Sequence, residues 1–543
     1  MRHADVNALS ELSGAGWDVC IIGSGPAGVA VAAELSGNGL RIVLLESGGH
    51  VRQDFADALD EVENVGWPRV EDQWLVRNRI VGGTSHTWSG RCVPFDAIDY
   101  EARSWVPESG WPVTAEEVRP YLDRAAPYLG ISRGTGYNDE GFWKIVQRQR
   151  PVPMFDESRL RSYYWAFSRD PDNAREHMRL GNHLPRWAGD DVMLVTNATV
   201  CRIAANDDAT LADAVEIAAP DGTRFRLGAR FIVLCAGGIE TPRLLLCSNT
   251  TLPAGLGNAR GQVGRYLMDH LRGPVASFPL AGTKNLRRQF GHYRIAGGQV
   301  FVHGMQMSET LQRDETLMNT TAWLEGRITP DDPYNALKRW ARLKPELPGD
   351  ALSVLRNLGL LTSGARDYFV ARNGLPRKIE RLNLVAMCEQ LPDAESRVTL
   401  SDQRDRLGLP RARIDWRVHE QEERSLRRIT QLVTEEFSRL GLPVPIADDW
   451  IRDDAPLPQD FRDVAHPTGT TRMGRDPARA VVDENCLVHG MRNLYIAGSA
   501  VFPTSSHANP TQMVVALAIR LADELKRAAH RNMNICTDIH ASV

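Results

Sequence analysis

The sequence predicts an α/β protein in which a nucleotide-binding sheet is assembled from distant parts of the chain. An apolar run, residues 18–22, leads into a GxGxxG pattern that extends from Gly23 to Gly28. Two further strand-like segments that end in glycine, 230–238 and 493–498, lie far downstream. A chain of 543 residues is also too long for one compact core, so we expect two or three domains.

The N-terminal segment has the order of elements that a dinucleotide requires. The apolar run is typical of a buried parallel strand, and an Ala- and Val-rich helix follows the glycines. Gly23, Gly25 and Gly28 permit a tight turn and a close approach of the backbone to a pyrophosphate at the helix N-terminus. A second strand, RIVLLE, ends at Glu46, where an acid can accept hydrogen bonds from a ribose diol.

The positions of the remaining strands distinguish FAD from NAD. A Rossmann unit for NAD is normally one contiguous domain. Here RFIVLCAGG (230–238) continues directly into a predicted helix, and NLYIAG (493–498) is another apolar strand ending in glycine. This dispersal favours a flavoprotein in which FAD lies through a domain built from several segments.

Composition excludes several other classes. The net charge of −4 gives no support to nucleic-acid binding or to a polybasic membrane patch. The eight cysteines form no CxxC pair and no metal-spaced cluster, so we expect reduced thiols, a cytoplasmic location and no metal ion. The N-terminus lacks the apolar core of a signal peptide, and no run of about 18 apolar residues predicts a membrane span.

Separated motifs along nearly the whole chain resemble the glucose–methanol–choline (GMC) oxidoreductase family. Besides the N-terminal nucleotide fold they are VGGTSHTWSGRCVP (81–94), GWPVTAEEVRPYLDRA (110–125), CAGGIETPRLLL (235–246), GRYLMDHL (264–271), ESRVTLSD (395–402), HPTGTTRMG (466–474) and GSAVFPTSSHANPTQMVVALAIRLADEL (498–525). Their order and spacing carry the resemblance. It implies a GMC-type fold with a discontinuous Rossmann-like FAD-binding domain and a substrate domain built on an antiparallel sheet with helices.

The resemblance implies domain boundaries as well. We expect the FAD-binding domain to comprise 1–100, 190–275 and 460–530, the substrate-binding domain 101–189 and 276–459, and a frayed tail 531–543. The alternating patterns SRVTLSD and RARIDWRV are typical of strands of the substrate sheet with one solvated face. Residues 332–374 are expected to form helices interrupted by Pro and Gly, as a lid, a subunit contact or a packed insertion.

Within the family the chain is most similar to the pyranose-oxidase-like branch and to bacterial sugar or glycoside dehydrogenases. Gly498 stands where many members have an Asp, and Asn509 where many have a second His. That branch attaches its flavin through a His just before the Trp of the Gly-Gly loop. Here Thr87 stands there and His86 is one residue earlier, so we expect non-covalent FAD.

Two residues are candidates for the chemistry of alcohol oxidation, which requires loss of the hydroxyl proton and transfer of a hydride to flavin N5. A neutral imidazole can accept the proton, and His466 occupies the family position for this base. Asn509 can cap the helix that begins with Pro510 and can also bind the substrate oxygen beside His466. His507 either lines the substrate pocket or closes a turn before the helix.

The cofactor contacts implied by the resemblance follow the same motifs. Gly82 and Gly83 let backbone amides approach FAD, Trp88 and Ser89 lie near the isoalloxazine, and Val200 meets the adenine end through its backbone. The full set of expected FAD-binding residues is Gly23, Gly25, Gly28, Glu46, Gly82, Gly83, Thr84, Trp88, Ser89, Val200, Ala236, Gly498, Pro510 and Thr511.

The predicted activity is FAD-dependent oxidation of a hydroxyl of a sugar, glycoside, aminosugar or similar polyol, with O₂ or another electron acceptor. Two alternatives stay open: a hydroxynitrile-lyase-type enzyme that keeps FAD only structurally, and a non-catalytic flavin-binding scaffold. The exact substrate, the electron acceptor and the oligomeric state do not follow from the sequence.

Overall fold

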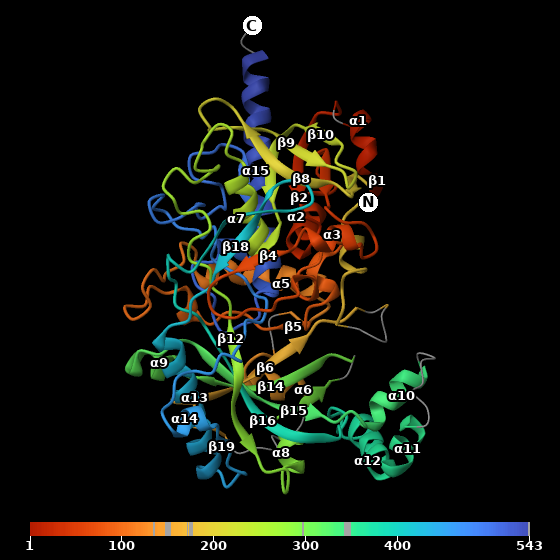
Figure 1. Ribbon diagram of the computed structural model, residues 1–543, viewed down its shortest axis with the longest axis vertical. Coiled ribbons are helices and arrows are strands. Elements are labelled where there is room, and N and C mark those ends of the chain that lie inside the picture. The colour runs from red at the N-terminus through yellow and green to blue at the C-terminus, as the bar shows by residue number, and fades with distance from the viewer. Residues whose placement is uncertain are drawn as a thin grey trace.

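Two large sheets, one parallel and one antiparallel, organise the chain (Figure 1). The structure is a computed structural model, and it describes residues 1–540 except 13, 134–135, 147–153, 171, 173–177, 296–297 and 342–348, with side chains described as far as residue 531. The parallel sheet lies in the upper half of Figure 1 and the antiparallel sheet in the lower half.

The parallel sheet has six strands in the order β1-β7-β3-β2-β11-β20. They are β1 (Arg2–Asp5), β7 (Val192–Thr196), β3 (Ile42–Leu45), β2 (Trp17–Ile22), β11 (Ala229–Leu234) and β20 (Leu494–Ile496). All five pairings are parallel. The central strands are buried apolar runs because helices cover the sheet. This is the doubly wound arrangement that the N-terminal motif predicts, with its strands drawn from three distant regions.

Helices α2 (Pro26–Leu35), α5 (Ala115–Tyr128) and α15 (Thr511–His540) pack together beside this sheet. Helix α7 (Gly237–Cys247) follows β11. Short elements connect these parts: η1 (Val6–Ala8), α1 (Leu9–Leu12), α3 (Asp54–Ala58), η2 (Gln73–Leu75), η3 (Gly83–His86), α4 (Ala97–Tyr100), η4 (Leu184–Trp187) and η5 (Ser499–Val501). Residues 531–540, expected as a frayed tail, continue α15 instead, and the helix projects at the top of Figure 1.

Two small sheets flank the parallel sheet. One is β10-β9-β8, with β8 (Thr199–Ala205), β9 (Ala212–Ala218) and β10 (Arg224–Leu227). The other joins β17 (Arg397–Arg404) and β18 (Pro410–Asp415) to β4 (Val62–Asn64). The patterns SRVTLSD and RARIDWRV therefore form strands that pair with each other, but in a separate sheet, because β18 pairs in parallel with β4 rather than with the large antiparallel sheet.

The antiparallel sheet has the order β19-β12-β16-β15-β14-β6-β5, and β13 also pairs with β14. Its strands are β5 (Arg91–Cys92), β6 (Leu160–Phe167), β12 (Leu271–Phe278), β13 (His292–Arg294), β14 (Val300–Met307), β15 (Thr320–Ile328), β16 (Ile379–Cys388) and β19 (Ile446–Ala447). The expected domain boundary at residue 100 lies eight residues after β5, and the expected boundary at residue 275 lies within β12.

Helix α13 (Glu420–Arg439) packs against strands of the antiparallel sheet, with Leu426, Ile429 and Val433 buried. The other helices of this half are α6 (Asp139–Val146), α8 (Lys284–Gln289), α9 (Glu309–Glu315) and α14 (Asp449–Arg452). The segment 332–374 forms α10 (Pro333–Ala341), α11 (Gly349–Arg356) and α12 (Leu358–Phe369), which project at the lower right of Figure 1. None of the helices in the described part of the chain has both the length and the apolar character needed to cross a bilayer.

Candidate active site

A cavity of about 550 Å³ lies between the two large sheets. Its wall on one side comes from the carboxyl ends of β2, β3, β11 and β20, where the strands give way to Gly23, Glu46, Ala236 and Gly498. The antiparallel sheet closes the other side with side chains of β12, β15 and β16. Ligands of open α/β sheets bind at this carboxyl edge, so the cavity lies where a dinucleotide is expected.

The glycine turn brings backbone rather than side chains to the cavity. Gly23 has φ of 101°, and a Cβ on it would lie 2.7 Å from the carbonyl oxygen of Cys235. Gly25 precedes Pro26, the first residue of α2, so the positive end of the helix dipole faces the cavity. Gly28 does not line the cavity: a Cβ there would lie 1.9 Å from the oxygen of Gly23, so this glycine permits close packing of helix and turn.

Glu46 lines the cavity and also ties the glycine turn together. Its Oε2 accepts hydrogen bonds from the backbone N–H of Ser24 at 3.0 Å and from the Ser24 hydroxyl at 2.6 Å. Its Oε1 accepts from the N–H of Gly48 at 3.1 Å. Burial raises the pKa of Glu46, while these hydrogen bonds oppose the rise. Oε1, with one donor, keeps lone-pair capacity for a further hydrogen bond.

The Gly-Gly loop lies directly on the glycine turn. Gly83 has φ of 56°, and a Cβ on it would lie 2.8 Å from Cα of Gly25. Gly82 faces away from the cavity, where a Cβ would lie 2.1 Å from the oxygen of Gly181. The remaining predicted cofactor residues that line the cavity are Thr84, Trp88, Ser89, Val200, Ala236, Gly498, Pro510 and Thr511.

His466 and Asn509 face each other at this cavity although 43 residues separate them. The amide Nδ2 of Asn509 lies 3.4 Å from Nε2 of His466, and both residues line the cavity. The other ring nitrogen, Nδ1 of His466, lies 3.0 Å from Nδ1 of His270. His270 is fully buried and lies in the motif GRYLMDHL (264–271), whose sequence alone assigned this histidine no role.

The hydrogen bonds of His270 determine the tautomer of His466. Nε2 of His270 lies 2.8 Å from the carbonyl oxygen of Ser506, and because a carbonyl only accepts, this nitrogen carries the proton. In the neutral ring Nδ1 of His270 is then the acceptor, so Nδ1 of His466 donates to it. Nε2 of His466 is left with its lone pair directed at the Asn509 amide and the cavity. The residues thus present an unprotonated imidazole nitrogen to whatever occupies the cavity.

Burial supports the same protonation state. It lowers the pKa of His466 well below its usual value, and the charges of Arg272 and Arg91 lower it further. Burial likewise lowers the pKa of His270. Both rings are therefore neutral near pH 7, which is the state that a general base requires.

An ion-pair cluster holds the backbone of His466. Its N–H donates to the carboxylate of Asp269 at 3.0 Å. Nη2 of Arg69 lies 3.0 Å from both Asp269 and Asp463, and all three side chains are buried. Ala465, the residue before His466, has φ of 59°, an unfavourable conformation for a residue with a Cβ. The cluster therefore fixes the loop in the conformation that aims the imidazole at the cavity.

The side chain of Asn509 does not cap the helix, contrary to the sequence-based expectation. α15 begins at Thr511, and its first turn is closed by the N–H of Val514 and the carbonyl of Pro510 at 2.9 Å. Oδ1 of Asn509 is buried and has no hydrogen-bond partner among the described residues. The Asn509 amide points toward His466 instead. The presence of an asparagine here is therefore explained by its place in the cavity wall and not by helix capping.

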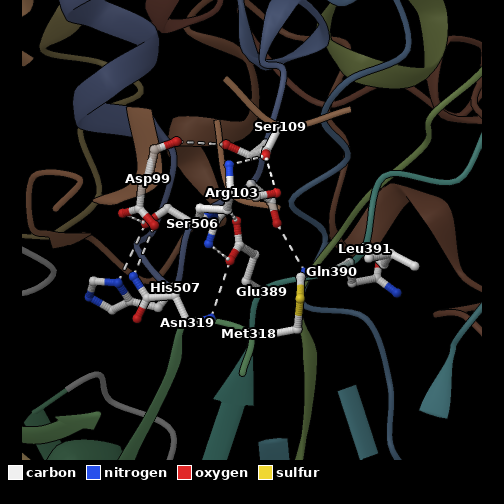
Figure 2. A network of polar contacts seen from close by, with 12 residues as sticks. Asp99, Arg103, Ser109, Met318, Asn319, Glu389, Gln390, Leu391, Ser506 and His507 are labelled. Atoms are coloured by element: carbon white, nitrogen blue, oxygen red, sulfur yellow. Dashed lines mark hydrogen bonds and ion pairs between the residues drawn. The ribbon is translucent and has the colours of Figure 1, made fainter. Parts of the chain in front are cut away.

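His507, expected as a possible pocket residue, does not line the cavity. Figure 2 shows it in a network of polar contacts that also contains Asp99, Asn319 and Ser506. Its Nδ1 lies 3.2 Å from the amide nitrogen of Gln306 and 3.5 Å from Oδ2 of Asp96. Burial lowers the pKa of His507 to about 4. The turn at Ser506, which has φ of 57°, directs this ring away from the cavity.

The residues around the cavity fit a flavin dinucleotide. The glycine turn and the start of α2 offer N–H groups to a pyrophosphate, and Glu46 has acceptor capacity for a ribose. At the other end, Nε1 of Trp88 and Oδ1 of Asn509 are buried polar atoms without a partner among the described residues. Because buried polar groups are normally satisfied, these two atoms indicate that a polar ligand belongs between them.

Comparison with known families agrees with this geometry. Two family models, both described as GMC oxidoreductase, match the chain in order: the N-terminal model over residues 165–272 and the C-terminal model over residues 392–518. The chain belongs to the GMC oxidoreductase family. As a member of it, this GMC oxidoreductase is a flavoenzyme that acts on CH–OH groups and uses FAD, which the resemblance implied.

Relatives of this GMC oxidoreductase match it over nearly its full length. A 2-methyl-1,2-propanediol dehydrogenase of Mycolicibacterium austroafricanum is 26% identical over 94% of this chain and 95% of its own. A 6'''-hydroxyparomomycin C oxidase of Streptomyces lividus is 25% identical over 95% of this chain and 93% of its own. Among solved structures, pyridoxine 4-oxidase from Mesorbium loti has a TM-score of 0.56 and 16% identity, covering 94% of this chain and 99% of that one. The last similarity supports the fold.

Proposed function

We propose that this GMC oxidoreductase oxidises a hydroxyl of a sugar, glycoside or similar polyol to the carbonyl, with His466 as general base and Asn509 as the substrate-oxygen ligand. The observation that supports it most directly is the lone pair of His466 Nε2 beside the Asn509 amide at the cavity. The relatives' names, a diol dehydrogenase and an aminoglycoside oxidase, support a polyhydroxylated substrate, and for the same reason an aminosugar belongs to the proposed range.

His466 and Asn509 have different roles when the substrate hydroxyl loses its proton. A substrate hydroxyl placed between them donates its proton to Nε2 of His466, whose Nδ1–H stays directed at His270. The Nδ2 amide of Asn509 then donates a hydrogen bond to the oxygen as it gains negative charge. Bound FAD supplies the acceptor for the hydride that leaves the same carbon. Pro510 and Thr511, at the positive end of α15, line the cavity beside Asn509 and offset negative charge there.

We propose that FAD is held non-covalently by the residues expected from the sequence, with Gly28 and Gly82 acting through packing and the others from the cavity wall. Support for the non-covalent mode comes from Thr87, whose hydroxyl donates to Oδ1 of Asn78 at 2.6 Å and offers no imidazole for attachment. We also propose that 1–100, 190–275 and 460–530 form the FAD-binding domain and that 101–189 and 276–459 form the substrate-binding domain. The proposed electron acceptor is O₂ or another compound. The proposal includes a cytoplasmic location, which is supported by the seven described cysteines, all of them free thiols.

The test is anaerobic mixing of the holoenzyme with a panel of polyols and sugars, followed by flavin absorbance. Loss of the oxidised-flavin band on mixing with a substrate is the expected result. Conversion of a cyanohydrin without any bleaching would instead identify lyase chemistry. A flavin that no alcohol bleaches and that catalyses neither reaction would leave a binding scaffold and overturn the proposal.

A further inference from the structure

Arg91 lies in the cavity wall opposite the glycine turn. It belongs to the short strand β5 at the end of the antiparallel sheet, where it pairs with Phe167 of β6. Its guanidinium carbon lies 5.0 Å from the ring centre of Trp165 and 4.9 Å from that of Trp323. Aromatic faces therefore surround the cation on the protein side and stabilise its charge.

No carboxylate in the described part of the chain is paired with Arg91. Among the described residues none forms a hydrogen bond or an ion pair with its guanidinium, although five N–H donors are present. Its nearest cationic neighbour, Arg272, also lines the cavity and pairs with Glu325. Burial and the charge of Arg272 lower the pKa of Arg91 to about 10, so the group is still a cation at neutral pH. An enclosed cation without an anion is unusual in a folded protein.

The acids that line the cavity do not compensate this charge. Asp60 and Glu240 pair with Arg79 at the end near Glu46. Asp463 pairs with Arg69. On the side of the antiparallel sheet, Arg91 and Arg272 thus face one partly exposed acid, Glu325, leaving an excess of one positive charge.

This excess charge lies near the reacting atoms. The charges of Arg91 and Arg272 both contribute to the low pKa of His466, and all three residues line the same cavity. The aromatic ring of Trp323 lies between the two cations, with Arg272 at 5.2 Å from its centre. A substrate whose hydroxyl contacts His466 is therefore able to reach Arg91 with another of its groups.

We propose that Arg91, assisted by Arg272, binds an anionic group of the substrate, so that the substrate is a hydroxyl compound carrying a carboxylate or a phosphate ester. The inference rests on the proposed function and narrows its substrate class. The planar guanidinium suits the two oxygens of either anion. This narrowing removes protonated aminosugars from the proposed substrate range, because both arginines would repel the ammonium group.

The experiment compares matched alcohols in anaerobic stopped-flow reduction of the holoenzyme. The pairs are gluconate and sorbitol, glycerate and glycerol, and glucose 6-phosphate and glucose; the first two probe a carboxylate and the last a phosphate. The expected result is a kcat/KM at least roughly tenfold higher for an anionic member, the effect of one charge-assisted hydrogen bond. Neutral members that react equally well, or faster, would overturn the inference while leaving alcohol oxidation intact.

The variant Arg91→Gln should abolish that preference by lowering kcat/KM for the anionic members toward that of their neutral counterparts, whereas Arg91→Lys should retain part of the preference. Arg372→Gln, at an exposed arginine after α12, is the matched control. If Arg91→Gln slows all substrates equally, the arginine acts on the cofactor's charge and the substrate role is wrong.

Binding is measured independently of turnover by titrating the oxidised holoenzyme with acetate, and separately with inorganic phosphate, against chloride at equal ionic strength. A saturable change of the flavin spectrum in wild type that is lost in Arg91→Gln is expected. Equal responses in wild type and variant would refute the anion site even if no alcohol in the panel reduced the flavin. Full FAD content in Arg91→Gln and Arg91→Lys verifies that these two variants fold.

Discussion

Nδ1 of His466 lies 3.0 Å from Nδ1 of His270, and the Ser506 carbonyl on the far side of His270 fixes the direction of that hydrogen bond. The two rings stand at 89° to one another. The consequence is that His466 presents Nε2, unprotonated, to the cavity.

Replacing the base should slow reduction of the flavin without removing the flavin. In His466→Ala the hydroxyl proton has no positioned acceptor, so the reduction rate constant should fall by roughly 10²–10⁴-fold, with FAD content near that of wild type. Single-turnover reduction measured anaerobically determines this rate constant. His530→Ala, at an exposed histidine on α15, is the control, and a His466 variant as fast as wild type would remove this residue from the mechanism.

The pH dependence of reduction follows from the lowered pKa of His466. A base whose pKa lies below 6.5 is already unprotonated at neutral pH, so the rate constant should be level at pH 7 and above. It should fall only when the pH drops through the lowered pKa, where the imidazole gains a proton. Stopped-flow reduction from pH 4.5 to 9 gives the profile; a fall centred above pH 7 would contradict a neutral His466 at pH 7.

His270 should act as a positioning residue for His466. Its replacement in His270→Phe removes the acceptor for Nδ1–H, so His466 no longer holds one tautomer, and reduction should slow by roughly 10–100-fold, the effect of losing a ligand-orienting hydrogen bond. The inflection of the pH profile should also move downward, because the neutral His270 ring accepts from Nδ1–H and so stabilises the protonated form of His466. A purely structural role would reduce stability or FAD content and leave that inflection in place.

The sequence predicted the nucleotide half of the site because that information is local. The glycines, Glu46 and the strands at 230–238 and 493–498 each lie within a short motif whose spacing determines its geometry. The partnership of His270 and His466 spans 196 residues and depends on how two loops pack, which periodicity cannot show. The unpaired state of Arg91 is equally a property of the assembled cavity.

The errors have similar causes. A helix-start pattern identified Asn509 as a cap, yet a competing hydrogen bond to His466 determines where its amide points. Strand β1 (Arg2–Asp5) at the edge of the parallel sheet had no recognisable pattern, because a short edge strand needs no apolar run. Alternation identified β17 and β18 as strands but not the sheet that they join, since period-two patterning carries no information on the partner.

Glu46 should support FAD binding through the glycine turn as well as through the ribose. Glu46→Gln keeps the shape but replaces one acceptor oxygen with an NH₂ group that opposes the N–H of Gly48 or of Ser24. We expect purified protein with reduced FAD content and a raised Kd for FAD, with reduction kinetics near wild type once FAD is added in excess. Full retention of FAD during dialysis would show that this acceptor is dispensable.

The buried acid Asp99 should make the stability of the enzyme depend on pH in an unusual direction. Burial, with the nearby charges of Asp96 and Glu389, raises the pKa of Asp99 to about 8, and Figure 2 shows it hydrogen-bonded to Ser506 and Asn319. The unfolded chain has a pKa near 3.8 for this group. Between pH 3.8 and pH 8 the folded state thus binds more protons than the unfolded chain. The stability that Asp99 contributes is therefore fully present below pH 3.8 and is lost as the pH rises toward 8.

In Asp99→Asn this loss should disappear. The amide is neutral at every pH and keeps an oxygen to accept from the Ser506 hydroxyl, which lies 2.6 Å away in wild type. The free energy of unfolding of the variant relative to wild type should therefore rise between pH 5 and pH 8.5 by on the order of 1–3 kcal/mol. Denaturant unfolding of both holoenzymes across that range gives the difference, in which the titration of other groups such as Glu422, also with a raised pKa, cancels. A difference that stays constant with pH would mean that Asp99 is ionised in the folded protein, with Arg103 rather than a proton balancing its charge.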